Sequence, residues 1–162
     1  AKYSSMKHAG GFTLIEMMVT LAIISVLAML VVPMAQISVQ RGKEQALRLA
    51  LRDIRSAIDA YKRASDEGRI PRDGNTNGYP PSLQILVDGI GDDKHPKRQK
   101  IRFLRRLPRD PMFPDQSVDP AQTWGLRSYS SDASDPKEGS DVYDVYSRSS
   151  LSGLNNVPYR VW

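Results

Sequence analysis

A run of 24 uncharged residues, from Met17 to Gln40, limits what this chain can fold into more than any other feature. At about 1.5 Å per residue, a helix of this length crosses a hydrocarbon layer of about 30 Å. One charged side chain, Glu16, lies directly before the run, and the next charge is Arg41. The sequence therefore predicts one transmembrane helix, over about residues 12–40, with a single carboxylate near its start.

That carboxylate needs a partner or a purpose, because a charge at the centre of a membrane helix costs about 2.5–3.5 kcal/mol to insert. Glu16 falls in the first turn of the predicted helix, where the positive end of the helix dipole stabilises an acid. If the chain is cut between Gly11 and Phe12, the new amino group lies one turn from Glu16. The carboxylate can then serve its own helix end, or it can meet the amine of a neighbouring copy and set the register between two helices.

The segment Gly10-Gly11-Phe12-Thr13-Leu14-Ile15-Glu16 follows a short basic leader and precedes the apolar run. It resembles the signature of the type IV pilins and pseudopilins. The resemblance implies that a prepilin peptidase cuts after Gly11 and methylates the new amino terminus at Phe12. It places the family's assembly acid at Glu16 and its helix proline at Pro33. In filaments of the family the helix stretches near that proline; the alternative is a proline tolerated in a membrane helix without such a role.

A second helical pattern follows the apolar run. Apolar residues recur at spacings of three and four between Leu47 and Tyr61, and no strong helix breaker occurs before Gly68. We therefore expect one helix over 12–67, whose part from 41 to 67 is amphipathic and packs on the chain's own domain; the alternative is a surface for a partner. Residues 1–11 are the expected leader, and residues 68–162 are the expected globular domain.

Shorter patterns predict the remaining elements. Residues 79–89 predict a short helix with prolines near its start and a glycine at its end. Thr123–Tyr129 and Asp141–Ser147 alternate apolar and polar residues between turn formers, which predicts two antiparallel strands, and 159–162 is a third candidate. The predicted fold class is α+β, with a long N-terminal helix packed on a small antiparallel sheet, as in the type IV pilin-like fold.

A five-residue element narrows the resemblance. Leu107-Pro108-Arg109-Asp110-Pro111 resembles an element of the major, or G-type, pseudopilin of type II secretion systems, although Met112-Phe113 replaces the Trp-Gly that follows it there. The resemblance implies a structural subunit of a periplasmic pseudopilus that polymerises to drive protein export. Its implied partners are other copies of itself, other pseudopilins, the prepilin peptidase and the inner-membrane assembly platform. The chain has no cysteine, so its domain must hold without disulfides. The resemblance credits many true pilins with a C-terminal disulfide loop, so this absence fits a pseudopilin better.

The charges that flank the apolar run do not orient it. Lys2 and Lys7 precede the run, whereas Arg41, Lys43 and Arg48 follow it, so the positive-inside rule alone places the globular domain in the cytoplasm. The resemblance implies the opposite: a single-pass protein of the bacterial inner membrane with a cytoplasmic N-terminus and a periplasmic domain. We follow the resemblance, because the rule is weak for long translocated domains.

Calcium is the cofactor that the resemblance raises, because G-type pseudopilins hold it with oxygens from a loop near the C-terminus. In this chain residues 148–156, which follow the last of the two predicted strands, contain no carboxylate. An earlier acidic stretch offers Asp132, Asp135 and Asp141, and calcium prefers six to eight oxygen ligands. We expect no cofactor, with these three acids as the candidates if calcium binds.

Charge is segregated along the domain. Residues 94–109 hold eight Lys or Arg and no acid, and residues 110–144 hold eight acids. Arg105, Arg106 and Arg109 are therefore candidates for a subunit interface with the acidic face of the next copy; the alternative is ordinary solvated or intrachain pairing.

Two other function classes find less support. A minor pilin that binds DNA or another polyanion would use the same basic segment, but Phe103 is the one aromatic platform within it. No nucleophile motif, phosphate loop or metalloprotease pattern indicates an enzyme. The sequence therefore favours a structural subunit that binds neither substrate nor nucleic acid.

Overall fold

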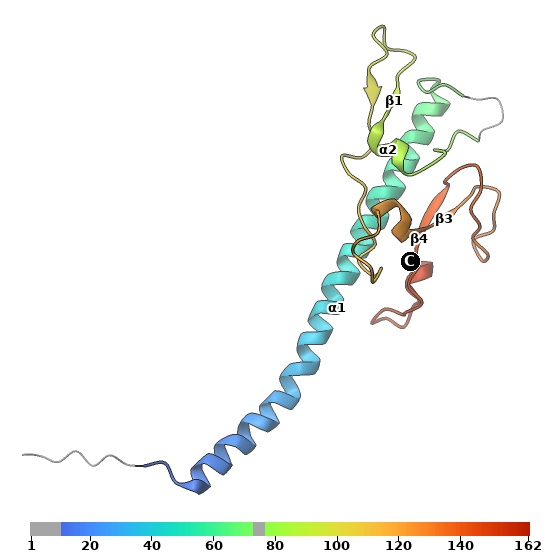
Figure 1. Ribbon diagram of the computed structural model, residues 1–162. Helices are drawn as coiled ribbons and strands as arrows, with labels where there is room; N and C mark the ends of the chain where they lie inside the picture. Colours follow the sequence, from blue (N-terminus) through green and yellow to red (C-terminus); the bar gives the residue numbers. More distant parts are fainter. Residues whose placement is uncertain (1–10, 73–76) are drawn as a thin grey trace, which may run out of the picture. The chain divides into compact units, whose positions relative to one another are not determined.

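The computed structural model describes residues 11–72 and 77–162. The chain divides into two compact units, and the boundary between them in the sequence lies between Gln40 and Arg41. One helix, α1 (Leu14–Asp66), contributes residues to both units (Figure 1). The long N-terminal helix predicted from the sequence is therefore confirmed. The expected leader, residues 1–11, lies outside the described residues except for Gly11.

The second unit is built on the C-terminal part of α1. The buried face of the helix follows the spacing of three and four residues, with Leu47, Ile54 and Ile58 almost fully inaccessible to solvent. These side chains pack with apolar residues from the rest of the unit, which include Leu83, Leu86, Trp124, Val142, Val145 and Tyr159. The amphipathic stripe is thus the core of this chain's own domain.

Two short antiparallel hairpins contribute to this unit. β3 (Trp124–Arg127) pairs with β4 (Asp144–Ser147), with Trp124 opposite Ser147 and Gly125 opposite Tyr146. Gly125 is required there, because a Cβ at this position would lie 2.3 Å from the Tyr146 ring. The predicted pair of antiparallel strands is confirmed, and with α1 it gives the predicted α+β class.

The other hairpin was not predicted. β1 (Ile90–Gly91) pairs with β2 (Lys100–Ile101), in a segment for which the sequence predicted no helix or strand. Strands of two residues leave no alternating pattern to detect. After β2, the amide groups of Phe103 and Leu104 both donate to the Leu86 carbonyl at 2.9 Å, which ties the end of the hairpin to the short helix before it.

Two predicted elements were wrong in extent or kind. The helix expected over 79–89 is only α2 (Gln84–Asp88), because the Pro80 carbonyl accepts a hydrogen bond from the Val142 amide instead of one within a helix. The expected third strand is a 3₁₀ turn, η2 (Tyr159–Val161), since the amide of Trp162 donates back to the Tyr159 carbonyl. A second 3₁₀ turn, η1 (Pro120–Thr123), precedes β3.

Candidate functional site

The start of α1 is a capping box formed by Thr13 and Glu16. The Thr13 amide and hydroxyl both donate to Glu16 Oε2, at 2.9 and 3.0 Å, and the Glu16 amide donates to the Thr13 hydroxyl at 3.3 Å. This reciprocal pattern satisfies amide groups that a helix N-terminus otherwise leaves without partners. Glu16 therefore serves its own helix end, and Oε1 takes no part in the capping box.

The capping box was not predicted, although the sequence contains the pattern that indicates one. Thr-x-x-Glu before an apolar run is the pattern that indicates such a cap. Gly11 and Phe12 precede the helix in extended or irregular backbone, and both are exposed, with Phe12 83% accessible. The peptide bond between them thus lies outside regular structure.

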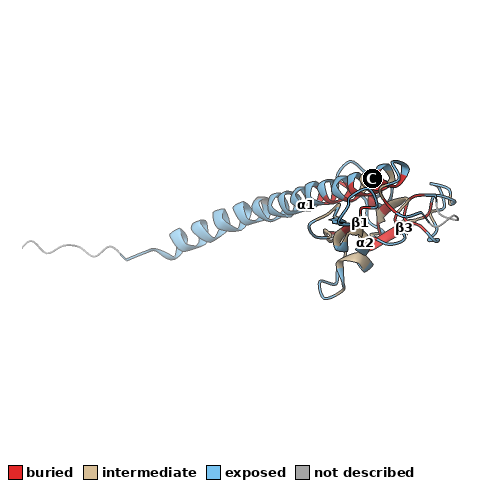
Figure 2. Ribbon diagram, turned by 90° about the horizontal axis from the view of Figure 1, so that it is seen from above, coloured by how far each residue is buried: buried red, intermediate tan, exposed pale blue. Residues whose placement is uncertain are grey.

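The apolar part of α1 is exposed along its described side chains. Every residue from 11 to 39 whose side chain is described is exposed, and Figure 2 shows this part of the helix in pale blue. By length and composition the helix is able to cross a membrane, and the apolar segment that qualifies it is entirely unburied. Pro33 lies within this segment, and α1 continues through it without a break.

The three arginines of the candidate interface have different surroundings. Arg105 and Arg106 are exposed and form no ion pair with the residues that the structure describes. Arg109 is half-buried, and its guanidinium donates to the Val118 carbonyl at 2.6 Å and to the Asp115 carbonyl. Arg109 therefore holds the loop that follows it, whereas the other two are available to a partner.

The aromatic residue of the basic segment is half-buried and packs against the core. Phe103 packs its ring on Tyr61 of α1, with ring centroids 5.4 Å apart. A ring occupied in this way is a poor platform for stacking nucleic-acid bases.

Several acids of the acidic stretch have partners inside the chain. Asp110 is fully buried and accepts from the Ser147 hydroxyl at 2.6 Å and from the Met112 amide at 2.8 Å. Asp144 pairs with Arg55 at 2.8 Å and with Arg127 at 3.5 Å. These acids hold the domain together, so a partner would meet the exposed acids of the stretch instead.

The three calcium candidates are not brought together. Asp141 is buried and accepts from the Ser128 hydroxyl at 2.5 Å, while exposed Asp135 pairs with Lys137 at 2.8 Å. Asp132 closes a local turn, in which the Ser134 amide and hydroxyl hold the pKa of this carboxyl below its ordinary value. Within residues 11–72 and 77–162, no three Asp, Glu or His side chains are placed to share a metal ion.

Comparisons with known proteins show which sequences this chain resembles. Residues 6–32 match the family model of the prokaryotic N-terminal methylation motif. Type II secretion system core protein G of Klebsiella pneumoniae is 34% identical over 119 residues, covering 72% of this chain and 79% of that protein. The protein of the same name from Pseudomonas aeruginosa is 31% identical over 140 residues, covering 83% and 91%. That from Pectobacterium carotovorum is 33% identical over 122 residues, covering 74% and 73%.

No solved structure matches the chain. The methylation motif, the long apolar helix behind it and the extent of these alignments lead to one conclusion. The chain belongs to the type II secretion system core protein G family, the G-type pseudopilins.

Proposed function

We propose that this pseudopilin is a structural subunit of a periplasmic type II secretion pseudopilus, which polymerises to drive protein export. The observation that supports this role is the apolar part of α1, whose described side chains are all exposed behind a capped helix start. Such a surface is stable in lipid, or against the same surface of other copies. A subunit that moves from membrane storage into a filament needs both.

Processing at Gly11/Phe12 fits the local backbone. A prepilin peptidase needs an accessible peptide bond, and this bond lies before the first turn of α1. Cleavage there makes Phe12 the first residue and leaves the capping box of Thr13 and Glu16 intact. The helix end therefore stays ordered after the leader is removed and Phe12 is methylated.

Glu16 then has a second acceptor for assembly. Its Oε2 is used by Thr13, while Oε1 accepts from the Phe12 amine of a neighbouring copy in the filament. A charge pair is strong in a medium of low dielectric constant, so only the register that joins the two groups is favourable. Glu16 thus acts both as a cap and as a register mark.

The proposed location is the inner membrane, with residues 12–40 as the anchor, the N-terminus in the cytoplasm and residues 68–162 in the periplasm. Pro33 gives the anchor a point at which its hydrogen bonding is incomplete, which lets the helix lengthen on assembly. The partners are other copies, other pseudopilins, the prepilin peptidase and the assembly platform. The role is mechanical and needs no catalytic residue.

The basic segment is the proposed contact between successive copies in the periplasm. Arg105 and Arg106 meet the exposed acids Asp132, Asp135 and Glu138 of the next copy. Such a contact joins two different surfaces, so it repeats along a helical stack without closing. Arg109 supports it indirectly, because it holds the adjoining loop through backbone carbonyls.

The decisive experiment separates processing from assembly. The intact mass of the protein is measured after purification from membranes with and without the peptidase. With the peptidase, the mass should show the loss of residues through Gly11 and the gain of one methyl group, and without it the mass should be that of the uncut chain. Glu16→Ala and Glu16→Gln should be processed and inserted normally but should not form cross-linked filament ladders. Glu16→Gln is informative, since an amide preserves the shape and the acceptor of the cap without the charge.

Thr20→Ala is the matched control. Its hydroxyl donates within the helix to the Met17 carbonyl at 3.0 Å, so its loss should leave assembly unchanged. Normal filaments from Glu16→Gln would show that the cap alone matters and would contradict the proposed ion pair. Retention of the first eleven residues in the mature protein would overturn the function itself.

A further inference from the structure

The last fifteen residues of the second unit have little regular structure of their own. After β4 the chain has one isolated bridge, Ser152 with Pro158, and the short turn η2. Most of this segment is exposed, yet Tyr159 is 2% accessible. Residues 148–162, here termed the C-terminal segment, must therefore be held in place by contacts with other elements.

Glu44 of α1 supplies the first such contact. Its side chain is buried, and its Oε1 accepts from the Leu154 amide at 2.8 Å and from the Tyr159 hydroxyl at 2.9 Å. The two donors lie 110 and 115 residues along the chain from Glu44. A buried carboxylate is tolerated only when it is well hydrogen-bonded, so its partners are fixed by the same need.

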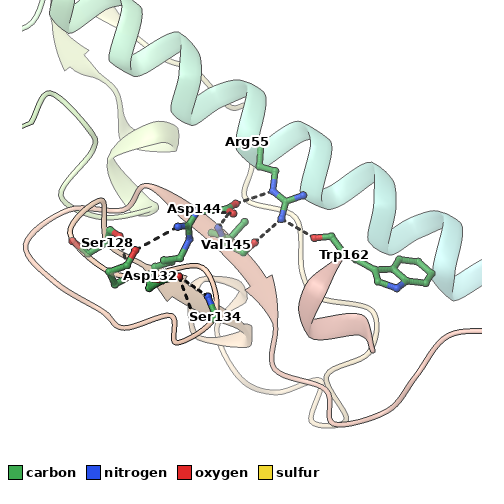
Figure 3. Close-up of polar contacts among 9 residues, drawn as sticks. Arg55, Ser128, Asp132, Ser134, Asp144, Val145 and Trp162 are labelled. Atoms are coloured by element: carbon green, nitrogen blue, oxygen red, sulfur yellow. Dashed lines mark hydrogen bonds and ion pairs between the residues drawn. The ribbon is translucent and has the colours of Figure 1, made fainter. Parts of the chain in front are cut away.

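Arg55 of α1 supplies the second contact, three helical turns further on. Its Nε donates to Asp144 Oδ1 at 2.8 Å, and its Nη2 donates to the carbonyls of Val145 at 3.2 Å and Trp162 at 2.8 Å. Figure 3 shows this guanidinium between β4 and the end of the chain. It therefore ties the last strand and the last residue to one point on the helix.

Aromatic contacts join the two points. The Trp162 ring packs edge-on against Tyr159, at 5.0 Å between centroids, and the Arg48 guanidinium lies 4.4 Å from the centre of the Trp162 ring. Residues 44, 48 and 55 recur at spacings of four and seven, so they share one face of α1. The C-terminal segment is thus bound along this face.

The segment does not suit calcium. It contains no Asp or Glu, so its oxygens are hydroxyls, amides and carbonyls. Gly153 shows how closely it packs: a Cβ there would lie 2.5 Å from the Trp162 ring and 3.3 Å from Glu44 Oε1. Glu44 brings a carboxylate to this loop from α1, and two donors of the loop already use its Oε1.

We propose that Glu44 and Arg55 hold the C-terminal segment where other G-type pseudopilins use calcium, so that this domain folds and keeps its C-terminal segment docked without the ion. The inference rests on family membership and on contacts within one chain, and it does not depend on polymerisation. Failure of filament assembly would therefore leave it untouched, and the test below uses subunits that are not assembled.

The test is limited chymotrypsin digestion of the full chain in detergent micelles, with excess calcium or with excess EGTA. Cleavage within the segment, after Leu151, Leu154 or Tyr159, is followed by mass spectrometry. Its rate reports how often the segment leaves the helix, because cleavage follows the population of the open form. The wild type should be cleaved at the same slow rate in both conditions.

Glu44→Ala should speed this cleavage by at least about tenfold, because it leaves two donors without their acceptor, and calcium should not restore protection. Tyr159→Phe removes a single hydrogen bond and should speed cleavage several-fold; it decides the question if Glu44→Ala does not fold. Asp53→Ala, which removes an exposed carboxylate from the same helix, is the matched control and should behave as wild type.

Two results would overturn the proposal. If calcium slows cleavage of the wild type relative to EGTA, the segment binds the ion. If both Glu44→Ala and Tyr159→Phe are cleaved at the wild-type rate, the carboxylate does not hold the segment.

Discussion

The two parts of α1 share one helix and differ in where their apolar side chains find partners. Before Arg41 every described side chain is exposed except that of Gln40, and Ile24 is 60% accessible. After it, apolar residues recur at spacings of three and four among charged ones, and Ile54 is completely buried. The apolar stripe of the second part packs against the core of the chain's own domain, whereas the first part is apolar on all sides. A helix that is apolar all round needs an apolar environment, such as lipid or other helices, on every side.

The largest expected effect tests this contrast directly. Ile54→Ala should lower the free energy of unfolding by about 2–5 kcal/mol, because it leaves a cavity in the core. Ile24→Ala, the same substitution in the first part, should change unfolding of the globular domain by less than about 0.5 kcal/mol. Urea unfolding of the full chain in micelles, followed by circular dichroism, compares them. Equal effects would mean that the first part is also packed within the chain.

The contrast extends to polar groups. Asp110 is buried and depends on the Ser147 hydroxyl, 2.6 Å away, so Ser147→Ala should cost about 1–3 kcal/mol by leaving a carboxylate oxygen without its donor. Ser117→Ala is the control, because its exposed hydroxyl serves exposed Asp115. Urea unfolding measures both. An effect of Ser147→Ala no larger than that of the control would show that burial does not decide the cost.

Arginines that form no ion pair within residues 11–72 and 77–162 should behave like the first part of α1. Arg105→Glu with Arg106→Glu should leave the unfolding curve of the monomer unchanged and weaken filament cross-linking, by about 0–1 kcal/mol for each exposed bridge lost. Raised salt should weaken the wild type in the same direction. Lys97→Glu, another exposed cation of this segment, is the control. Assembly that ignores both salt and the reversal would remove this interface.

The smallest expected effect concerns Asp92, whose charged partner lies within the same domain. This effect is seen only at acid pH. Two hydrogen bonds from Arg69, at 2.7 and 3.1 Å, hold the pKa of Asp92 below its ordinary value. Since the pKa is lower in the folded state, the stabilisation is present above the unfolded pKa of about 3.9 and is lost as the pH falls through the folded value.

The unfolding temperature measured between pH 6 and pH 3 should therefore fall less in Asp92→Asn than in the wild type. Asp53→Asn, at an exposed position of α1, should follow the wild type. Parallel curves for Asp92→Asn and the wild type would show that this pair does not contribute to acid sensitivity.

The parts of the fold that could be predicted from the sequence are those with a repeating pattern of apolar residues. The long helix and the β3–β4 pair repeat apolar residues over enough positions to be recognised, and the basic β1–β2 hairpin does not. The strand expected at 159–162 rested on four residues, and local hydrogen bonds turned it into η2.

The candidate site was partly readable as well. The motif around Glu16 identified the family, and its capping box is a local pattern that could have been read from Thr13. The buried roles of Glu44 and Asp110 could not, because their side-chain partners lie 115 and 37 residues away. A carboxylate that binds so distant a donor looks, in the sequence, like any surface acid.

The placement of the two tryptophans gives the molecule a pair of natural optical probes. Trp124 lies in the core with its indole nitrogen 2.9 Å from the Pro108 carbonyl, and Trp162 lies over Arg48 at the chain's end. Indole emission depends on solvent and on nearby charge, so each residue reports a separate event without any attached dye. When one tryptophan is replaced by phenylalanine, the emission of the other reports a single event. Trp124 then reports unfolding of the core, and Trp162 reports release of the C-terminal segment from α1.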